Sequence, residues 1–333
     1  MFEKIIEKVY RAKSILLFTH VNMDGDAMGS TMALCRVMRK LGKDCRILIE
    51  DPVPRYLDFM DDGTMFAHLS DYRAGGHGPA DLAIAVDIGQ DKRLESRLPE
   101  FRTAKESCCI DHHRHTTEDS GFAEEEIRDA SAAAACVLVQ EMLEEMEQGA
   151  GELIDKDVAE DLYVGIMTDT GSFRFSNTDS RTHLAVARLF ARGIDHSKIS
   201  TYIYDSYPMA QLKLEALAMA RAMIFCEGKA CISWACAEDF KTNNADYSMS
   251  ETCIDRLRSI EGVEIAAFIR EKEDGTFKVS MRSKLYADVG SVCAQFSGGG
   301  HMMAAGCSFK CPVDDIVDQL KPAIERELAK WTE

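Results

Sequence analysis

The chain begins with an apolar run, a polar turn and an amphipathic segment. Residues 15–18 (ILLF) form a continuous apolar run of the kind found in strands that are buried on both faces. Four apolar residues between Leu34 and Leu41 recur at the spacing of one helical face. Gly42 stands where a glycine commonly ends a helix. The pattern predicts a buried strand, a turn and a helix.

The same alternation continues through the first half of the chain. Further apolar runs of strand length lie at residues 45–50, 82–87 and 107–111. Segments of helical length lie at residues 131–146, 155–170 and 181–192. Strands that alternate with helices are typical of an α/β fold with a parallel sheet. We assign no role to the irregular stretch 51–80.

The second half of the chain has a different pattern. Residues 193–222 are predicted to be helical for much of their length, and short strands follow at 223–235 and 263–284. A chain of 333 residues also favours two domains over one. We therefore predict an α/β chain with a parallel-sheet domain over 1–192, a helical linker over 193–222 and a smaller mixed α/β domain over 223–333.

One hairpin of the second domain has a predictable register. Apolar residues alternate along 263–272 and again along 277–284. A two-residue turn would pair apolar with polar positions, whereas a three-residue loop, Glu273 to Gly275, aligns the two apolar faces. The opposite face then carries Phe268, Arg270, Lys278, Ser280, Arg282 and Lys284. This basic face suits a nucleotide phosphate and base, and the alternative is a strand face exposed to solvent.

Polar residues that could bind metal follow several of the predicted strands. His20, Asp24 and Asp26 follow the first strand, Asp87 ends another, and His112 follows a third. Asp169 lies on the apolar stripe of the helix 155–170, where a carboxylate is costly unless it is paired or bound to a cation. Because the carboxyl ends of parallel strands share one edge, we expect these side chains to meet in one cleft.

The number of these groups bears on the kind of metal site. The first cluster alone could be a polar turn with a capped helix. Six ligands are too many for one tetrahedral zinc and suit two metals that share a bridging carboxylate. Nitrogen and oxygen ligands favour a divalent transition metal such as manganese.

Composition narrows the functional classes. The net charge is −17, which argues against a protein that wraps long nucleic acid. Residues 1–13 contain no signal-peptide core and the apolar runs are too short to cross a bilayer, so we expect a cytoplasmic protein that does not bind membranes. The 12 cysteines include no C-x-x-C pair and are expected to be free thiols.

Taken in order, these segments resemble the motifs of the DHH phosphoesterases. The matching segments of the first half are His20-x-x-x-Asp24-x-Asp26-x-x-Gly29-Ser30, Val86-Asp87, Asp111-His112-His113 and residues 165–171 (GIMTDTG). In the second half, the segments that resemble the DHH-associated C-terminal domain are Arg282-Ser283-Lys284, Asp288-Val289, Gly298-Gly299-Gly300-His301 and Ala304-Ala305-Gly306. The resemblance covers nearly the whole chain and is strongest to the bacterial nanoRNase and pAp phosphatase subgroup.

The resemblance implies roles for these residues. His20, Asp24 and Asp87 would bind one manganese ion, and Asp26, Asp87, His112 and Asp169 the other, with magnesium or cobalt as alternatives. The catalytic group would comprise Asp87, His113 as a donor to phosphoryl oxygens, and Asp111, which either orients a histidine or caps a strand. Substrate would be bound by Arg282, Ser283, Lys284, Gly298, Gly299, Gly300 and His301.

The resemblance also implies an activity. We expect a metal-dependent phosphodiesterase that hydrolyses very short oligonucleotides, including pGpG and pApA, to nucleoside monophosphates, and that converts pAp to AMP. The substrate would bind between the domains, and the protein could form a homodimer. The alternatives are a soluble cyclic-di-AMP phosphodiesterase and a non-enzymatic nucleotide sensor, although a sensor should lack at least one ligand.

Overall fold

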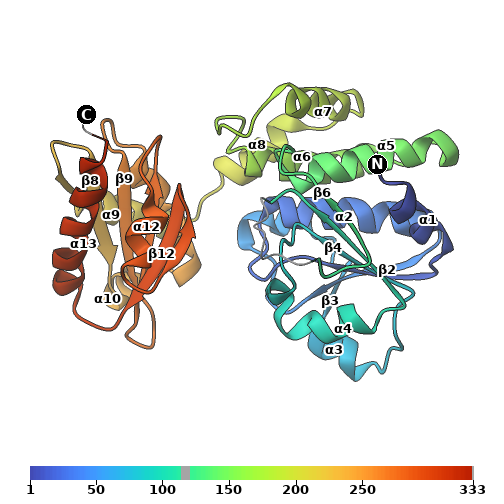
Figure 1. Ribbon diagram of the computed structural model, residues 1–333, viewed down its shortest axis with the longest axis horizontal. Coiled ribbons are helices and arrows are strands. Elements are labelled where there is room, and N and C mark those ends of the chain that lie inside the picture. The colour runs from blue at the N-terminus through green and yellow to red at the C-terminus, as the bar shows by residue number, and fades with distance from the viewer. Residues whose placement is uncertain (114–120, 332–333) are drawn as a thin grey trace. The chain divides into compact units, whose positions relative to one another are not determined.

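The computed structural model describes residues 1–113 and 121–331 (Figure 1). The contacts within the chain define two units, Met1–Ser206 and Tyr207–Glu333. The predicted linker 193–222 contains two helices, α8 (His196–Tyr204) and α9 (Met209–Ala220), which are separated at Pro208. Helix α8 belongs to the first unit and α9 to the second. The expected boundaries at 192 and 222 stay a prediction.

The N-terminal unit is built on a parallel sheet, as predicted. Its strands are β1 (Ser14–Phe18), β2 (Asp44–Ile49), β3 (Phe66–His68), β4 (Leu82–Val86), β5 (Glu106–Asp111) and β6 (Glu125–Arg128). They lie in the order β3-β2-β1-β4-β5-β6, and every pairing is parallel. The direction of progression reverses between β1 and β4, which is where open α/β sheets place their ligands.

Helices cover both faces of this sheet (Figure 1). The helices of the unit, besides α8, are α1 (Glu3–Arg11), α2 (Gly25–Lys40), α3 (Leu69–Ala74), α4 (Leu98–Thr103), α5 (Ala135–Ala150), α6 (Lys156–Asp169) and α7 (Ser180–Ala191). Helix α2 packs on one face with α5 and α6, whereas α3 and α4 pack on the other. Because both faces are covered, β1 and β4 read as continuous apolar runs.

Helices α2 and α6 approach each other through glycine. A Cβ added at Gly29 would lie 2.3 Å from the carbonyl oxygen of Asp161. A Cβ added at Gly165 would lie 2.2 Å from Cys136 Sγ and 2.9 Å from Asp26 Oδ1. Only a residue without a side chain fits at either point. The glycines therefore bring the C-terminal end of α6 close to the start of α2.

The stretch 51–80, whose role the sequence does not indicate, extends the sheet. It contains the 3₁₀-helix η1 (Arg55–Met60), the edge strand β3 and helix α3. The ring of Phe59 in η1 stacks on Tyr202 of α8, with centroids 4.7 Å apart. A second 3₁₀-helix, η2 (Asp91–Arg97), follows β4. Strand β6 was also missed, because its sequence EEIR carries no apolar run.

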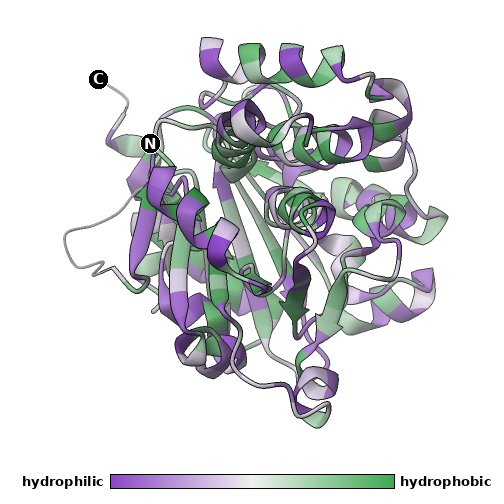
Figure 2. Ribbon diagram, turned by 90° about the vertical axis from the view of Figure 1, so that its right-hand side faces the viewer, coloured by the Kyte–Doolittle hydropathy of each residue, from purple (hydrophilic) through white to green (hydrophobic). Residues whose placement is uncertain are grey.

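The C-terminal unit contains a mixed sheet. Its strands are β7 (Met223–Phe225), β8 (Ala230–Ala235), β9 (Ile265–Glu271), β10 (Phe277–Ser283), β11 (Gly299–His301) and β12 (Ala304–Phe309), in the order β11-β12-β10-β9-β8-β7. The further helices are α10 (Ala237–Asn243), η3 (Tyr247–Ser250), α11 (Cys253–Arg258), α12 (Val289–Ala294) and α13 (Val313–Ala329). Helices α12 and α13 cover one face, and α9 and α11 cover the other. Figure 2 shows that helices of the molecule carry both hydrophobic and hydrophilic residues, as helices that cover a sheet on one side must.

The predicted hairpin register is confirmed. Val279 pairs with Ile269 and Met281 pairs with Ala267, so the apolar faces align. Gly275 has a φ of 74°, and the amide of Lys272 donates to the carbonyl oxygen of Thr276 at 2.8 Å, so the loop between these two residues is three residues long.

The predicted open basic face of this hairpin is wrong in one respect. Phe268 is 1% exposed and packs in a core with Leu214 and Leu257, because α9 and α11 cover this part of the sheet. Arg270 is 5% exposed. Phe268 is therefore a core residue and offers no stacking surface to a base.

Two further expectations concern the whole chain. All 12 cysteines are free, as expected. Within the described residues, no helix is both long enough and apolar enough to cross a lipid bilayer.

Candidate metal centre

Histidines and carboxylates gather at the carboxyl edge of the N-terminal sheet, beside the reversal between β1 and β4. Among the described residues, the groups with metal-binding spacing are His20-Asp24-Asp87, Asp26-His112-Asp169 and Asp87-His112-His113. Within each group, one ligand atom per residue lies within 4.8 Å of the others. All six predicted metal ligands are thus brought together.

His20 and Asp24 enter the cluster from the turn between β1 and α2. The Nδ1 of His20 lies 2.8 Å from the carbonyl oxygen of Val21, which turns Nε2 towards the cluster. Asp24 is the N-cap of α2, and its Oδ1 accepts from the amides of Asp26 and Ala27 at 3.1 Å each. Its Oδ2 lies 3.7 Å from His20 Nε2. One oxygen of Asp24 therefore caps the helix while the other faces the cluster.

Asp87 lies between the two halves of the cluster. It directly follows β4, and its φ of 60° is a left-handed conformation that is costly for a residue with a side chain. Its Oδ2 lies 3.5 Å from His20 Nε2, and its Oδ1 lies 3.4 Å from His112 Nε2. Each oxygen of one buried carboxylate thus faces a different histidine.

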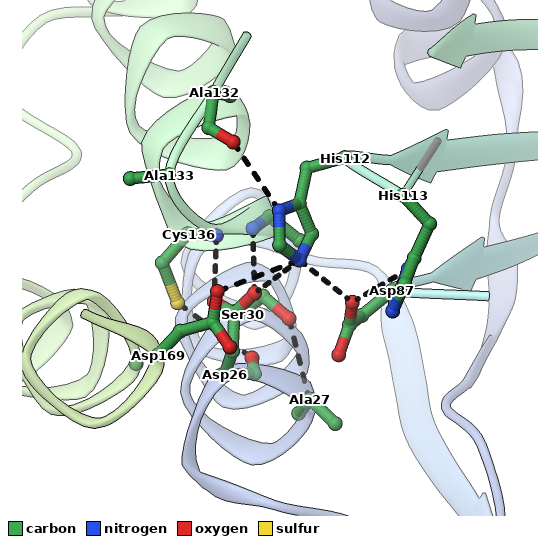
Figure 3. Close-up of polar contacts among 12 residues, drawn as sticks. Asp26, Ala27, Ser30, Asp87, His112, His113, Ala132, Ala133, Cys136 and Asp169 are labelled. Atoms are coloured by element: carbon green, nitrogen blue, oxygen red, sulfur yellow. Dashed lines mark hydrogen bonds and ion pairs between the residues drawn. The ribbon is translucent and has the colours of Figure 1, made fainter. Parts of the chain in front are cut away.

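His112 faces three carboxylates at once (Figure 3). Its Nε2 lies 3.4 Å from Asp87, 3.6 Å from Asp26 and 3.7 Å from Asp169. Its Nδ1 lies 3.3 Å from the carbonyl oxygen of Ala132, which orients the ring. Asp169 reaches the cluster from the last position of α6.

Asp26 is oriented by a helix that lies far away in the sequence. Its Oδ2 accepts from the amide of Ala135 at 2.6 Å. Its Oδ1 accepts from the amide of Cys136 at 2.9 Å, which Figure 3 shows. These amides are the first of α5, which begins at Ala135 and not at residue 131 as predicted. The N-cap Ala134 has no side-chain hydrogen-bond acceptor, so the carboxylate of Asp26 accepts the hydrogen bonds of the first two amides of this helix.

His113 and Asp111 form a pair beside the cluster. Asp111 is fully buried at the end of β5, and its Oδ1 accepts from His113 Nδ1 at 2.7 Å. The ring of His113 lies 4.8 Å from that of His112, and its Nδ1 is 3.4 Å from Asp87 Oδ1. Because Nδ1 is committed to Asp111, Nε2 is the atom that remains available to a substrate.

The charge state of the cluster follows from burial and close like charges. Burial opposes protonation of His20, yet hydrogen bonds to Asp24 and Asp87 raise its pKa to about 10. Burial and the charge of Asp26 raise the pKa of Asp169 to about 8. Burial and the charge of Asp87 raise the pKa of Asp26 to about 6. The carboxylates therefore need positive charge beside them, which protons supply when no cation is bound.

The residues fit divalent cations. Asp87 Oδ1 is buried and accepts no hydrogen bond from any described residue, so one ligand oxygen is left for another partner. His20 and His112 each present Nε2 while Nδ1 lies against a backbone oxygen, the arrangement typical of metal-binding histidines. Imidazole nitrogen combined with carboxylate oxygen suits divalent transition metals.

The predicted substrate-binding residues lie in the C-terminal unit. Ser283 is buried, and its Oγ lies 3.4 Å from the carbonyl oxygen of Met302. Lys284 Nζ donates to the carbonyl oxygen of Ile260 at 2.9 Å. Arg282 is half-buried at the end of β10, and its Nη1 donates to its neighbour Met281. The polar groups of Ser283 and Lys284 are thus engaged within the unit.

The glycine-rich loop is more exposed. Gly298 is held tightly, because a Cβ there would lie 2.3 Å from the carbonyl oxygen of Gly306. Gly299, Gly300 and His301 form the edge strand β11 and are exposed. Their outer edge is therefore open to a ligand.

Sequence reasoning missed two supports of the centre. One is the pair of α5 amides on Asp26, for which the alanine run 132–135 beside a helix was the available signal. The other is Asn177, whose Nδ2 donates to the carbonyl oxygens of Asp169 at 3.1 Å and Ala133 at 3.0 Å. This side chain links the end of α6 to the start of α5.

Family models match both units of the chain. The model described as the DHH family, N-terminal domain, matches residues 14–166, and the DHHA1 domain matches residues 228–330. A Thermus thermophilus protein named bifunctional oligoribonuclease and PAP phosphatase NrnA is 26% identical over 330 residues, which cover 98% of this chain and 94% of the relative.

Solved structures share the fold. An exopolyphosphatase-related protein from Bacteroides fragilis has a TM-score of 0.92 at 23% identity, covering 100% of this chain and 97% of the other. A structure of exonuclease RecJ bound to manganese has a TM-score of 0.55 at 13% identity, covering 98% of this chain and 93% of the other. At these identities the likeness establishes the fold alone.

Proposed function

This chain belongs to the DHH family of phosphoesterases, and from that premise we propose that it hydrolyses very short oligonucleotides and pAp with the help of two divalent cations. The relative from Thermus thermophilus carries both activities in its name, oligoribonuclease and PAP phosphatase. The predicted products are nucleoside monophosphates from short RNA, pGpG or pApA, and AMP from pAp.

One observation carries the proposal. The two oxygens of Asp87 face different histidines, at 3.5 Å from His20 and 3.4 Å from His112, while the strained backbone of Asp87 holds the carboxylate between them. A carboxylate in this position supports a bridging role between two cations. A polar turn with a capped helix would not need that arrangement.

The proposed ligand sets are those that the family resemblance implies. His20, Asp24 and Asp87 would hold one cation, and Asp26, Asp87, His112 and Asp169 the other. We propose manganese, with magnesium and cobalt as alternatives, because the donors combine imidazole and carboxylate. RecJ, which shares the fold, is described as bound to manganese. Paired cations of this kind activate a water molecule and stabilise the attacking and leaving oxygens of a phosphoester.

The chain's own residues orient these groups and the substrate. Asp111 accepts the Nδ1 proton of His113 at 2.7 Å, so it fixes the ring and leaves Nε2 to contact a phosphoryl oxygen. Asp26 is held by two amides of α5, and Asp24 by two amides of α2. Ligands fixed in this way need little reorganisation when a substrate binds.

The C-terminal unit would bind the rest of the nucleotide. Arg282 supplies a cation, and the exposed backbone of Gly299 and Gly300 with His301 supplies donors for a phosphate. Ser283 and Lys284 would act by shaping the strand end, since their polar groups are engaged within the unit. In a chain of net charge −17, these local cations favour a short ligand over a long one.

A product assay tests this function. The purified chain would be incubated with manganese and, separately, pAp, pApA, pGpG, cyclic di-AMP and a twenty-nucleotide RNA. We expect free phosphate from pAp and nucleoside monophosphates from the two linear dinucleotides. Turnover of cyclic di-AMP alone would favour the cyclic-dinucleotide phosphodiesterase. Binding of these nucleotides without any turnover would favour the sensor.

A further inference from the structure

Arg270, in the C-terminal unit, is a buried cation with no carboxylate partner. Its side chain is 5% exposed, and among the described residues no Asp or Glu lies within ion-pair distance of its guanidinium. Its Nη1 and Nη2 donate to Ser250 Oγ at 3.1 Å and to Ser280 Oγ at 3.2 Å. Its Nε has no hydrogen-bond partner in the described chain. A buried charge of this kind is costly unless another group compensates it.

The aromatic ring beside Arg270 compensates only part of that cost. The guanidinium lies 4.8 Å from the centroid of the Tyr247 ring, which is a cation–π contact. The hydroxyl of Tyr247 is also buried without a hydrogen-bond partner among the described residues. Arg270 and Tyr247, whose side chains are in contact, therefore each keep one buried polar group without a hydrogen-bond partner among the described residues, the Nε and the hydroxyl. An anion would compensate the positive charge of Arg270.

The two serines differ in what they can still donate. Ser250 Oγ donates to the carbonyl oxygen of Tyr247 at 2.6 Å, so its proton is in use. Ser280 Oγ accepts from Arg270, and no described residue accepts its own proton. Because Arg270 occupies the acceptor side of this half-exposed hydroxyl, its O–H is left to donate to another molecule.

Further cations flank Ser280 on the same face of β10. Lys278 lies opposite Arg270 in the register and is exposed, and Arg282 is the next residue along this face. Partial desolvation of the Lys278 amine beside the sheet lowers its pKa, and the positive charges of Arg270 and Lys272 lower this pKa further. Like charges placed opposite each other destabilise a sheet, and a bound anion would relieve that repulsion.

We propose that Ser280, with Lys278 and Arg282 beside it and Arg270 behind it, forms a phosphate-binding subsite on the α11 side of the C-terminal sheet. Ser280 donates to a phosphate oxygen, and Arg270 is the positioning residue that orients this hydroxyl. The ligand is a phosphate group of the nucleotide substrate other than the one that is hydrolysed, so the proposal rests on the proposed function. The subsite is distinct from the edge strand that contains Gly299 to His301.

Binding to metal-free protein tests the subsite without turnover. The full chain would be treated with a chelator and titrated calorimetrically with pAp, with adenosine and inorganic phosphate as comparators. We expect pAp to bind at least about tenfold more tightly than adenosine, and binding to weaken as salt rises. Adenosine binding as tightly as pAp would overturn the proposal.

Matched variants separate the subsite from its surroundings. Ser280→Ala should weaken pAp binding about tenfold, because it removes a hydrogen bond to a charged group, and Ser280→Thr should restore it. Lys278→Ala should weaken binding about two- to fivefold at low salt. Lys330→Ala, which removes an exposed lysine after α13 on the opposite face of the sheet, should leave it unchanged. Ser280→Ala with wild-type affinity for pAp would rule out the subsite.

Turnover measured in parallel keeps the two proposals apart. Hydrolysis of pAp by wild-type protein together with unchanged binding by Ser280→Ala removes the subsite and leaves the function intact. Conversely, Ser280-dependent binding of pAp without hydrolysis in manganese supports the subsite and removes the function.

Discussion

The contact between α2, α5 and α6 provides a direct test of how the metal centre is built. We predict that Gly165→Ala lowers turnover far more than it lowers stability. The new Cβ would lie 2.2 Å from Cys136 Sγ and 2.9 Å from Asp26 Oδ1. Neither distance is tolerated by real atoms. Since both partners are buried, the helices must separate or Asp26 must move relative to His112.

The expected magnitudes follow from these contacts. Overpacking of a well-filled core costs about 1–3 kcal/mol, and alanine in place of a helical glycine recovers about 0.5–1 kcal/mol. The net loss of unfolding free energy is then roughly 0–2.5 kcal/mol, which lowers the unfolding midpoint of the N-terminal unit by no more than about 10 °C. A catalytic ligand displaced by about 1 Å can cost on the order of a hundredfold in rate.

The assay combines kcat/KM on pAp with thermal unfolding and metal content. Gly149→Ala is the matched control, because it adds the same methyl to helix α5 with nothing within 4 Å. The double variant Gly165→Ala with Cys136→Ala removes the sulfur and should recover part of the turnover. If Gly165→Ala retains wild-type kcat/KM and metal content, the close approach does not set the position of Asp26.

Three other predictions concern the bound cations, the role of Arg282 in substrate binding and the preferred length of the substrate. Asp87→Asn should lose at least one bound metal and nearly all turnover, and elemental analysis showing two metals with wild-type activity would contradict its bridging role. Arg282→Ala should raise KM for a dinucleotide about tenfold with a smaller fall in kcat, whereas a large fall in kcat at constant KM would place Arg282 at the transition state. On a ladder of labelled RNA at one salt concentration, kcat/KM should peak at about two to five nucleotides, because longer strands meet a net negative protein. Equal cleavage of twenty-nucleotide strands would instead favour a processive exonuclease.

The ligand set was predictable because each member has a local signal. His20, Asp87 and His112 each lie within two residues of the end of an apolar run of strand length, and the carboxyl ends of parallel strands share an edge. Asp169 is a charged residue on an otherwise apolar helical stripe. The hairpin register was predictable for a similar reason, since the alternation of apolar residues allows only one loop length.

The remaining features depend on contacts between segments distant in the sequence. Helix α5 begins at Ala135 because Asp26, 109 residues away, accepts its first amide, and no capping residue marks that start. The sequence predicts that Arg270 lies on an open basic face, yet α9 and α11 cover the hairpin beside Phe268, and Arg270 is buried. A period of two tells which residues share a face, and it does not tell what packs on that face.

The proposed cation ligands come from five elements, which has a thermodynamic consequence. They span residues 20 to 169 and lie at the ends of β1, α2, β4, β5 and α6, so no local fragment of the chain can assemble the set. Any free energy of cation binding is then added to the folding free energy of the N-terminal unit, at about 2.7 kcal/mol for a cation present at a hundred times its dissociation constant. The C-terminal unit contributes none of these ligands. A chelator should therefore lower the stability of one half of the chain only, and calorimetry should show one unfolding transition shift to lower temperature while the other stays in place.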